Sequence, residues 1–347
     1  MTIKYGSLCS GIEAATVAWH DLGWQPQFFS DIEKFPNAVL EHHYPDVPNH
    51  GDMTNFGDWP DESIDLLVGG TPCQSFSVAG LRKGLDDPRG NLALTYLAIA
   101  ERYAPRWLVW ENVPGVLSSR GGRDFGSFLG ALGKLGYGFA YRVLDAQFFA
   151  VAQRRRRVFV VGYLGDWRRA AAVLFERESR RRDTPPSREA GQKVTPTVVQ
   201  GAPYSRTGNK PVECDVIVPV MATLNATDGD KWGSNQWVNE GKAILHPIAL
   251  AENTIGRQPQ NGGNGDGFTV GGPMYTLNAT GVHGVSSDMA VRRLTPTEAE
   301  RLQGFPDGYT DIYENTPDTP RYKALGNSMA VPVMKWIGEK INKVDKI

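Results

Sequence analysis

The sequence has no long apolar run and very few cysteines. Its longest apolar stretches, such as residues 66–68 and 98–100, are far shorter than the roughly 18 residues that a membrane-spanning helix needs. The first residues show neither an apolar signal core nor an Arg-rich transit pattern, so we expect a cytoplasmic protein without a membrane partner. Cys9, Cys73 and Cys214 show no CxxC spacing, which argues against a disulfide framework and against a metal site.

The composition is that of a globular protein with an uneven charge distribution. Of the 347 residues, 41% are hydrophobic and 22% are charged, and this length predicts about two domains. The net charge of −1 gives no overall attraction to nucleic acid. However, residues 1–60 carry two Lys against eight acidic residues, whereas residues 151–182 carry ten Arg against three. The basic segment is either a solvated surface or a face that contacts phosphates.

The first half of the chain has the pattern of an α/β fold. Short β-rich apolar runs alternate with helical patterns up to about Asp166, which predicts an open, mostly parallel, doubly wound sheet. The expected strands are residues 3–8, 27–30, 64–68, 107–110, 141–144 and 157–162. The expected helices, with apolar residues at three- and four-residue spacing, are residues 12–20, 35–43, 91–103 and 125–135.

The pattern changes after about residue 183. Residues 191–290 contain fifteen Gly and eight Asn without a sustained helical period, which predicts a separate, loop-rich β region. In it, Thr-Leu-Asn-Ala-Thr at 223–227 recurs at 276–280, as either a pair of equivalent loops or a coincidence. Helices are expected again from Thr295 to about Leu302 and from about Val333 to Lys343. We therefore expect divisions at 1–182, 183–290 and 291–347, with the last segment packing back on the first.

Small and acidic residues follow the first two expected strands. Residues 9–11, Cys-Ser-Gly, lead from a strand into a helix, where free N–H groups and close backbone approach suit a nucleotide-like ligand. Asp31 is placed to accept hydrogen bonds from both hydroxyls of a ribose, and Asp52 to meet an adenine amino group. Each Asp taken singly is also explained as an N-cap or turn residue.

A second group of reactive side chains follows two later strands. Cys73 comes after Gly-Gly-Thr-Pro at residues 69–72, a restrained strand-to-loop junction that is expected to aim its sulfur at a crevice. A lone Cys is otherwise usually a small core residue. Glu111 ends the next strand and converges on the same edge of the sheet. Arg155 and Arg157, two positions apart, are expected on one face.

Six motifs, in matching order and spacing, resemble those of the bacterial and phage DNA (cytosine-5) methyltransferases. They are Pro72-Cys73-Gln74, Glu111-Asn112-Val113, the Gln-x-Arg-x-Arg of Gln153, Arg155 and Arg157, Leu294-Thr295-Pro296-x-Glu298, Gln303-Gly304-Phe305-Pro306 and Gly326-Asn327-Ser328. The resemblance covers about residues 5–165 and 292–333. It implies a Rossmann-like, S-adenosylmethionine-dependent catalytic domain at 1–182 and a smaller β target-recognition domain at 183–290.

The resemblance implies a covalent reaction on a cytosine rotated out of the duplex. Cys73 as thiolate attacks carbon 6, Glu111 gives a proton to ring N3, and carbon 5 takes the methyl group. Arg157 is implied to bond the ring O2, and Arg155 to support Glu111 and the loop. Since a free thiol is only a few per cent ionised at pH 7, the two arginines also favour the thiolate.

The same resemblance assigns ligand contacts. Around S-adenosylmethionine, which yields S-adenosylhomocysteine, it places Gly11, Ile12, Asp31, Ile32, Asp52, Met53, Pro72, Leu92, Asn327 and Ser328. Against double-stranded DNA it places Gln74, Ser75, Arg82, Lys83, Arg89 and Gln153, with residues 75–91 closing over the flipped base. Base-reading candidates are Asn225, Gln236, Arg257 and Asn278. A monomer is expected, and a companion restriction endonuclease is a candidate partner.

Three residues depart from the family pattern. The first motif usually reads Phe-x-Gly-x-Gly, but Cys9 stands for the Phe and Glu13 for the second Gly. A carboxylate at Glu13 suits a helix N-terminus and is expected to crowd or contact the methionine end of the cofactor. Ile32 stands where an aromatic residue is common, so weaker stacking on adenine is expected.

Three other functions are less consistent with these residues. A nicotinamide-dependent oxidoreductase would leave Cys73 without a role, and the Gly pattern after the first strand is too sparse for it. A catalytically silent DNA-binding relative would not require Cys73, Glu111, Arg155 and Arg157 together. An RNA-directed relative shares the Pro-Cys and Glu-Asn-Val motifs, but the long segment 183–290 favours sequence-specific recognition of duplex DNA.

Overall fold

The computed structural model describes residues 2–72, 92–175, 248–250, 268–270, 274, 276–277, 284–287 and 290–346. Several residues singled out in the sequence lie outside these ranges. They are Cys73, Gln74, Ser75, Arg82, Lys83, Arg89, Asn225, Gln236, Arg257 and Asn278, together with the first copy of the repeat.

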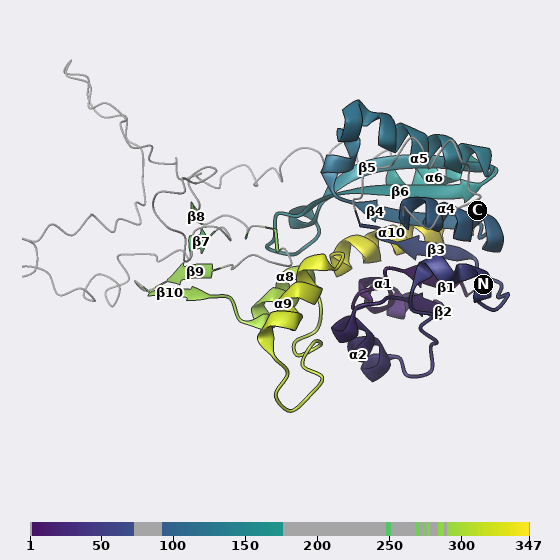
Figure 1. The fold of residues 1–347 in the computed structure, drawn as a ribbon. Helices are drawn as coiled ribbons and strands as arrows, with labels where there is room; N and C mark the ends of the chain where they lie inside the picture. The colour runs from purple at the N-terminus through teal and green to yellow at the C-terminus, as the bar shows by residue number, and fades with distance from the viewer. Residues whose placement is uncertain are drawn as a thin grey trace, which may run out of the picture.

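A six-stranded mixed sheet forms the centre of the molecule, in the order β2-β1-β3-β4-β6-β5 (Figure 1). The strands are β1 Lys4–Leu8, β2 Gln25–Ser30, β3 Leu66–Gly69, β4 Trp107–Asn112, β5 Tyr137–Asp145 and β6 Arg156–Leu164. Strands β1 to β4 run parallel, whereas β6 is antiparallel to both β4 and β5. The predicted α/β sheet is confirmed, and each of the six predicted strands overlaps an observed one.

Helices follow most strands and pack on the sheet. They are α1 Ala14–Trp19, α2 Lys34–His43, α4 Leu92–Tyr103, α5 Arg123–Lys134, α6 Trp167–Leu174, α8 Pro296–Gln303, α9 Asp318–Asn327 and α10 Val331–Val344. Single 3-10 turns are η1 His20–Leu22, η2 Met53–Asp58, η5 Pro114–Leu117, η6 Ser119–Gly122 and η7 Ala146–Phe148. Helices α6 and α9 were not predicted: α6 lies in the Arg-rich segment, and the weakly amphipathic α9 contains a Pro and a Gly.

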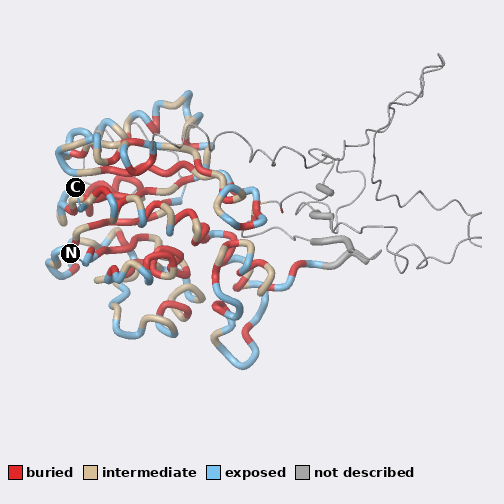
Figure 2. Tube along the Cα trace, turned by 180° about the vertical axis from the view of Figure 1, so that it is seen from behind, coloured by how far each residue is buried: buried red, intermediate tan, exposed pale blue. Residues whose placement is uncertain are grey.

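Two hydrophobic cores cover the two faces of the sheet. Alternation along the strands directs Val68 and Trp107 into the core with α1, α6 and α10, and directs Leu67 into the core with α4 and α5. The buried segments run along most of the strands (Figure 2). The last helix, α10, packs against α1, where Trp19 Nε1 donates to the Met334 carbonyl at 2.8 Å. The two ends of the described chain thus meet on one face.

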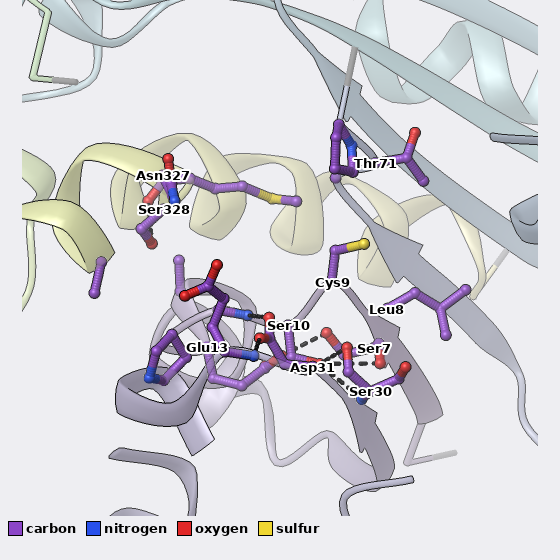
Figure 3. Close-up of a pocket in the computed structure, with 18 of the residues that line it drawn as sticks. Ser7, Leu8, Cys9, Ser10, Glu13, Ser30, Asp31, Thr71, Asn327 and Ser328 are labelled. Atoms are coloured by element: carbon purple, nitrogen blue, oxygen red, sulfur yellow. Dashed lines mark hydrogen bonds between the residues drawn. The ribbon is translucent and has the colours of Figure 1, made fainter. Parts of the chain in front are cut away.

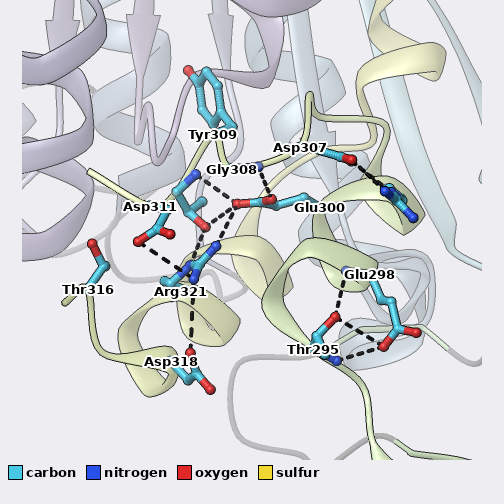
Figure 4. A network of polar contacts seen from close by, with 12 residues as sticks. Thr295, Glu298, Glu300, Asp307, Gly308, Tyr309, Asp311, Thr316, Asp318 and Arg321 are labelled. Atoms are coloured by element: carbon cyan, nitrogen blue, oxygen red, sulfur yellow. Dashed lines mark hydrogen bonds and ion pairs between the residues drawn. The ribbon is translucent and has the colours of Figure 1, made fainter. Parts of the chain in front are cut away.

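A buried ion pair organises the segment before α10 (Figure 4). The Glu300 carboxylate on α8 accepts hydrogen bonds from the backbone N–H groups of Gly308 and Thr310, at 2.7 and 2.8 Å. Its oxygen also lies 3.3 Å from the Arg321 guanidinium on α9. A capping box between Thr295 and Glu298 begins α8. These contacts hold α8, the following loop and α9 together, and α9 leads to the Gly-Asn-Ser motif.

A second, four-stranded antiparallel sheet lies apart from the central one (Figure 1). Its strands are β7 Ile248–Leu250, β8 Phe268–Val270, β9 Gly284–Ser287 and β10 Ala290–Arg293. The chain returns to the first domain at Met274, which exchanges backbone hydrogen bonds with Ala152 and Arg154. The domain boundaries stay a prediction. Within the described ranges, no helix combines the length and the apolar character that crossing a membrane requires.

Candidate active site

A cavity of about 700 Å³ lies at the carboxyl ends of β1 to β4 (Figure 3). Its walls come from the turns after these strands and from residues 320–329. Figure 3 shows Cys9 and Thr71 on one side of it and Asn327 and Ser328 on the other. Open α/β sheets bind their ligands at this edge, and the volume is typical of a small-molecule site.

The turn between β1 and α1 has an unusual backbone. Cys9, Gly11 and Glu13 all have left-handed conformations, with φ of 49°, 57° and 58°. Such a conformation is free for glycine but costs other L-residues roughly 1–2 kcal/mol. The backbone N–H of Gly11 donates to Oδ2 of Asp31 at 2.8 Å, which ties the turn to the end of β2. The tight turn brings the start of α1 to the cavity wall.

Two acidic residues predicted to hold an adenosine line this cavity. Asp31 also accepts a hydrogen bond from the Glu33 N–H, and burial raises the pKa of its carboxyl. Asp52 caps η2 through the Thr54 N–H at 2.9 Å. The other predicted cofactor residues on the wall are Gly11, Ile32, Met53, Pro72, Leu92, Asn327 and Ser328. The cavity and its carboxylates fit an adenosyl ligand with a cationic end.

Two residues of this turn, Ile12 and Cys9, have side chains that are buried or half-buried in the protein. The Ile12 side chain is fully buried in the core, and its carbonyl accepts a hydrogen bond from Tyr309 at 2.9 Å, so its contact with methionine stays a prediction. The Cys9 sulfur lies 3.6 Å from the Met53 sulfur. Burial, reinforced by the negative charge of Asp31 and Asp52, raises the pKa of Cys9 to about 12. Cys9 is therefore a thiol at neutral pH and a poor nucleophile.

Glu111 and Arg157 form an ion pair in the same cavity. Nε of Arg157 lies 3.1 Å from Oε1 of Glu111, and both side chains are largely buried. Burial raises the pKa of Glu111, and the positive charges of Arg157 and Arg155 oppose this shift. Because its pKa is raised, this carboxyl keeps a proton to a higher pH than a free glutamic acid does, which suits it to proton transfer.

The segment that leads to Cys73 is fixed to the neighbouring strand. Asn112 Nδ2 donates to the Thr71 carbonyl at 2.9 Å, and Trp110 Nε1 donates to its hydroxyl at 3.0 Å. A Cβ built on Gly70 would lie 3.1 Å from Glu111 Oε2, so a larger residue here would push this carboxylate by a few tenths of an ångström. The bonds from Asn112 and Trp110 to Thr71 and the space beside Gly70 were not predicted, although the Gly-Gly pair and the Asn after Glu111 are visible in the sequence. Cys73 lies three residues beyond Gly70, outside the described residues.

Arg155 connects separate parts of the chain behind the cavity. Its guanidinium donates to the carbonyls of Leu277, Gly326 and Ser328, at 2.9, 3.1 and 2.6 Å. Burial, and then the positive charge of Arg157, lower its pKa to about 9. Arg155 thus fixes the segment that carries Asn327 and Ser328, a role that sequence analysis did not predict.

Gln153, predicted to contact DNA, is instead buried inside the protein. Its Nε2 donates to the Leu302 carbonyl at 2.9 Å, and its Oε1 accepts from the Leu277 N–H at 3.0 Å. Because the side chain is fully buried and both ends of its amide are bonded to backbone groups, it does not face the surface in this conformation. Gln153 joins α8 and residues 276–277 to the start of β6.

Comparison with known proteins shows the family. The model of the family "C-5 cytosine-specific DNA methylase" matches residues 3–343. A phage P1 protein named DNA N-6-adenine-methyltransferase is 36% identical, over 98% of this chain and 61% of that protein, so the chain spans about three fifths of this relative. Type II methyltransferase M.NgoPII of Neisseria gonorrhoeae is 27% identical, over 98% of this chain and 96% of that protein.

Solved structures agree on the fold. S. pombe Dnmt2 methyltransferase superposes with a TM-score of 0.58 at 17% identity, covering 99% of each chain. A putative DNA modification methyltransferase from an E. coli prophage gives the same TM-score at 16% identity, covering 100% of each chain. With a family match over nearly its whole length, the chain belongs to the C-5 cytosine-specific DNA methylase family.

Proposed function

We propose that this protein transfers a methyl group from S-adenosylmethionine to carbon 5 of a cytosine in duplex DNA, through a transient bond between Cys73 and carbon 6. One observation carries the proposal. The Glu111–Arg157 pair, the Thr71-Pro72 segment that leads to Cys73, and the two carboxylates suited to adenosine all line one cavity.

In the proposed reaction, the Cys73 thiolate attacks carbon 6 while Glu111 gives its proton to ring N3. The electron pair of the ring then reaches carbon 5, which would take the methyl group that S-adenosylmethionine supplies when bound, as its sulfur–methyl bond breaks to leave S-adenosylhomocysteine. A base then removes the carbon 5 proton, and the bond between carbon 6 and the Cys73 sulfur breaks. This regenerates the Cys73 thiolate, and the N3 proton returns to Glu111. The raised pKa of Glu111 supports this role, because the carboxyl must be protonated before the attack. Arg157 is proposed to bond the ring O2, and its contact with Glu111 in the same cavity supports this role.

The cofactor is proposed to lie between the β1 turn and residues 327–328. Asp31 binds the ribose hydroxyls, and Asp52 binds the adenine amino group. Gly11 holds Asp31 in place through its backbone N–H. The proposed DNA contacts lie mostly in residues 73–91 and 183–290, which supply the closing loop and the recognition region for a flipped cytosine.

The test is the methylated base produced in cells. Plasmid DNA from cells that express the wild-type protein is expected to contain 5-methylcytosine by nucleoside mass spectrometry. The Cys73→Ala variant is expected to give none, and bisulfite sequencing of the same plasmid identifies the recognised sequence. N6-methyladenine without 5-methylcytosine would contradict the proposal and favour the activity in the name of the phage P1 relative. Labelled methyl transfer to transfer RNA instead of duplex DNA would also contradict it.

The covalent step needs its own test. Duplex DNA with 5-fluorocytosine at the methylated position cannot lose a proton from carbon 5, so the Cys73 adduct is expected to persist on a denaturing gel. The adduct is expected to require the methyl donor and to be absent with Cys73→Ala. A wild-type enzyme that forms 5-methylcytosine but never traps would contradict the covalent mechanism while leaving the methyltransferase activity intact.

A further inference from the structure

Glu13 is a buried carboxylic acid at the wall of the cavity. Its side chain is only 1% exposed, yet the residue lines the cavity together with Ser7 and Ser10 (Figure 3). Its left-handed backbone, with φ of 58°, is one that side chains rarely adopt. The fold therefore keeps a carboxyl here at a backbone cost that glycine would avoid.

The Glu13 carboxyl is bonded only to neutral donors. Oε1 accepts from the Ser7 hydroxyl at 2.5 Å, and Oε2 accepts from the hydroxyl and N–H of Thr16 at 2.6 and 3.3 Å. No ion pair of the described residues involves it, and burial raises its pKa to about 7. Buried carboxylates are normally paired with a cation. The cation that would complete this site is missing from the described part of the chain.

The titratable groups around Glu13 do not supply that cation. Tyr5, Tyr44 and Tyr309 face it, and burial raises the pKa of each, so they stay neutral. His43 stacks on Tyr309, with ring centroids 4.1 Å apart, and is not among the groups that act directly on Glu13. Asp31, on the other side of the turn, is itself acidic.

We propose that Glu13, as a carboxylate, binds the ammonium group at the amino-acid end of the methyl donor, and that this contact makes cofactor affinity depend on pH. The inference rests on the proposed function, since S-adenosylmethionine carries an ammonium group on that end. Gly11, whose N–H holds the proposed ribose ligand Asp31, is two residues from Glu13. One short turn thus carries contacts for both ends of a single ligand.

The direction of the pH dependence follows from linkage. Below pH 7 Glu13 is mostly protonated and must lose its proton to pair with the ammonium group. The affinity is therefore expected to rise about tenfold between pH 6 and pH 8. Asp31 and Glu111 are the other carboxyls on the wall with a raised pKa, so a variant at Glu13 is needed to assign the effect.

The test measures binding by the full chain with two ligands. S-adenosylhomocysteine contains the ammonium group, whereas 5′-methylthioadenosine lacks the whole amino-acid end. For Glu13→Gln, we expect at least a tenfold loss of affinity for S-adenosylhomocysteine at pH 8, no rise between pH 6 and 8, and unchanged affinity for methylthioadenosine. As the control at the adenine end, Asp52→Asn is expected to weaken both ligands.

Three outcomes would overturn the inference: a Glu13→Gln variant that weakens both ligands equally, one that weakens neither, or wild-type affinity that does not change with pH. The first two would make Glu13 a structural brace of the turn, which thermal unfolding of the variant would register. A wild-type protein that binds neither ligand would instead overturn the proposed function itself.

Discussion

The Nε atom of Arg157 lies 3.1 Å from Oε1 of Glu111, across the adjacent strands β6 and β4. Burial favours the neutral form of Glu111, and this guanidinium favours the charged form. Burial is the larger effect, so the pKa stays raised, as a carboxyl that must be protonated before it gives its proton to a ring requires. The contact also fixes where the carboxyl points.

Replacing Arg157 by Ala tests this balance. We expect the single-turnover rate of methyl transfer to duplex DNA to fall by about 10²–10³, as for the loss of one preorganised donor. Without the cation, burial raises the Glu111 pKa further, so the decline of the rate at alkaline pH, where Glu111 loses its proton, moves to higher pH. Arg157→Lys keeps the charge and is expected to shift this decline less. A decline that moves to lower pH would contradict the assignment of Glu111 as proton donor.

Gly70 offers a test of the position of Glu111 alone. The Cβ of Gly70→Ala would lie 3.1 Å from both Glu111 Oε2 and the Met329 methyl carbon, so one of them must move. Since misplacement by about 1 Å can cost about a hundredfold, the single-turnover rate is expected to fall by up to that factor. Gly126→Ala, on the exposed side of α5 with open space around its Cβ, is the matched control and is expected to keep the wild-type rate. Equal rates for both variants would contradict the role of Gly70.

The sequence predicted the parts of the site that local pattern controls. The strands of the central sheet are four to nine residues long, and most carry a short apolar or aromatic stretch, so they could be located without tertiary information. Asp31 directly follows β2, and Glu111 is the next-to-last residue of β4, and the geometry of a parallel sheet brings such ends to one edge. Their position on one cavity was therefore predictable.

Other features depend on contacts between residues distant in the chain. The partners of Gln153 lie 124 and 149 residues away, and no periodicity reveals whether an amide finds such partners or faces solvent. The guanidinium of Arg155 is likewise occupied by carbonyls more than 120 residues away. The Glu13 carboxyl was expected at the cofactor, but its burial against Ser7 and Thr16 depends on a left-handed turn that sequence pattern does not encode for a non-glycine residue.

The burial of Gln153 predicts a large effect on stability. Gln153→Ala leaves the Leu277 N–H and the Leu302 carbonyl without their partner, and each unsatisfied buried group costs about 1–3 kcal/mol. We expect the free energy of unfolding in urea to fall by about 2–5 kcal/mol. Gln147, whose amide bonds only the nearby Asp145 and which is half-buried, is the matched control. Gln147→Ala is expected to cost less than about 1 kcal/mol. A Gln153→Ala variant that is as stable as the wild type but binds DNA more weakly would support the prediction that Gln153 contacts DNA.

The raised pKa of Glu13 predicts that the stability of the cofactor-free protein changes with pH. Its pKa is about 7 when folded and about 4.3 when unfolded, so the folded state binds more protons between these values and stability falls as pH rises. The loss is about 3 kcal/mol by pH 8. Glu13→Gln is neutral throughout, so it is expected to match the wild type near pH 4 and to exceed it by up to that amount at pH 8. Urea unfolding of both proteins across this range measures the difference. A difference that stays constant, or that favours the wild type as pH rises, would show that the carboxyl is ionised without penalty and has no need of a cationic ligand.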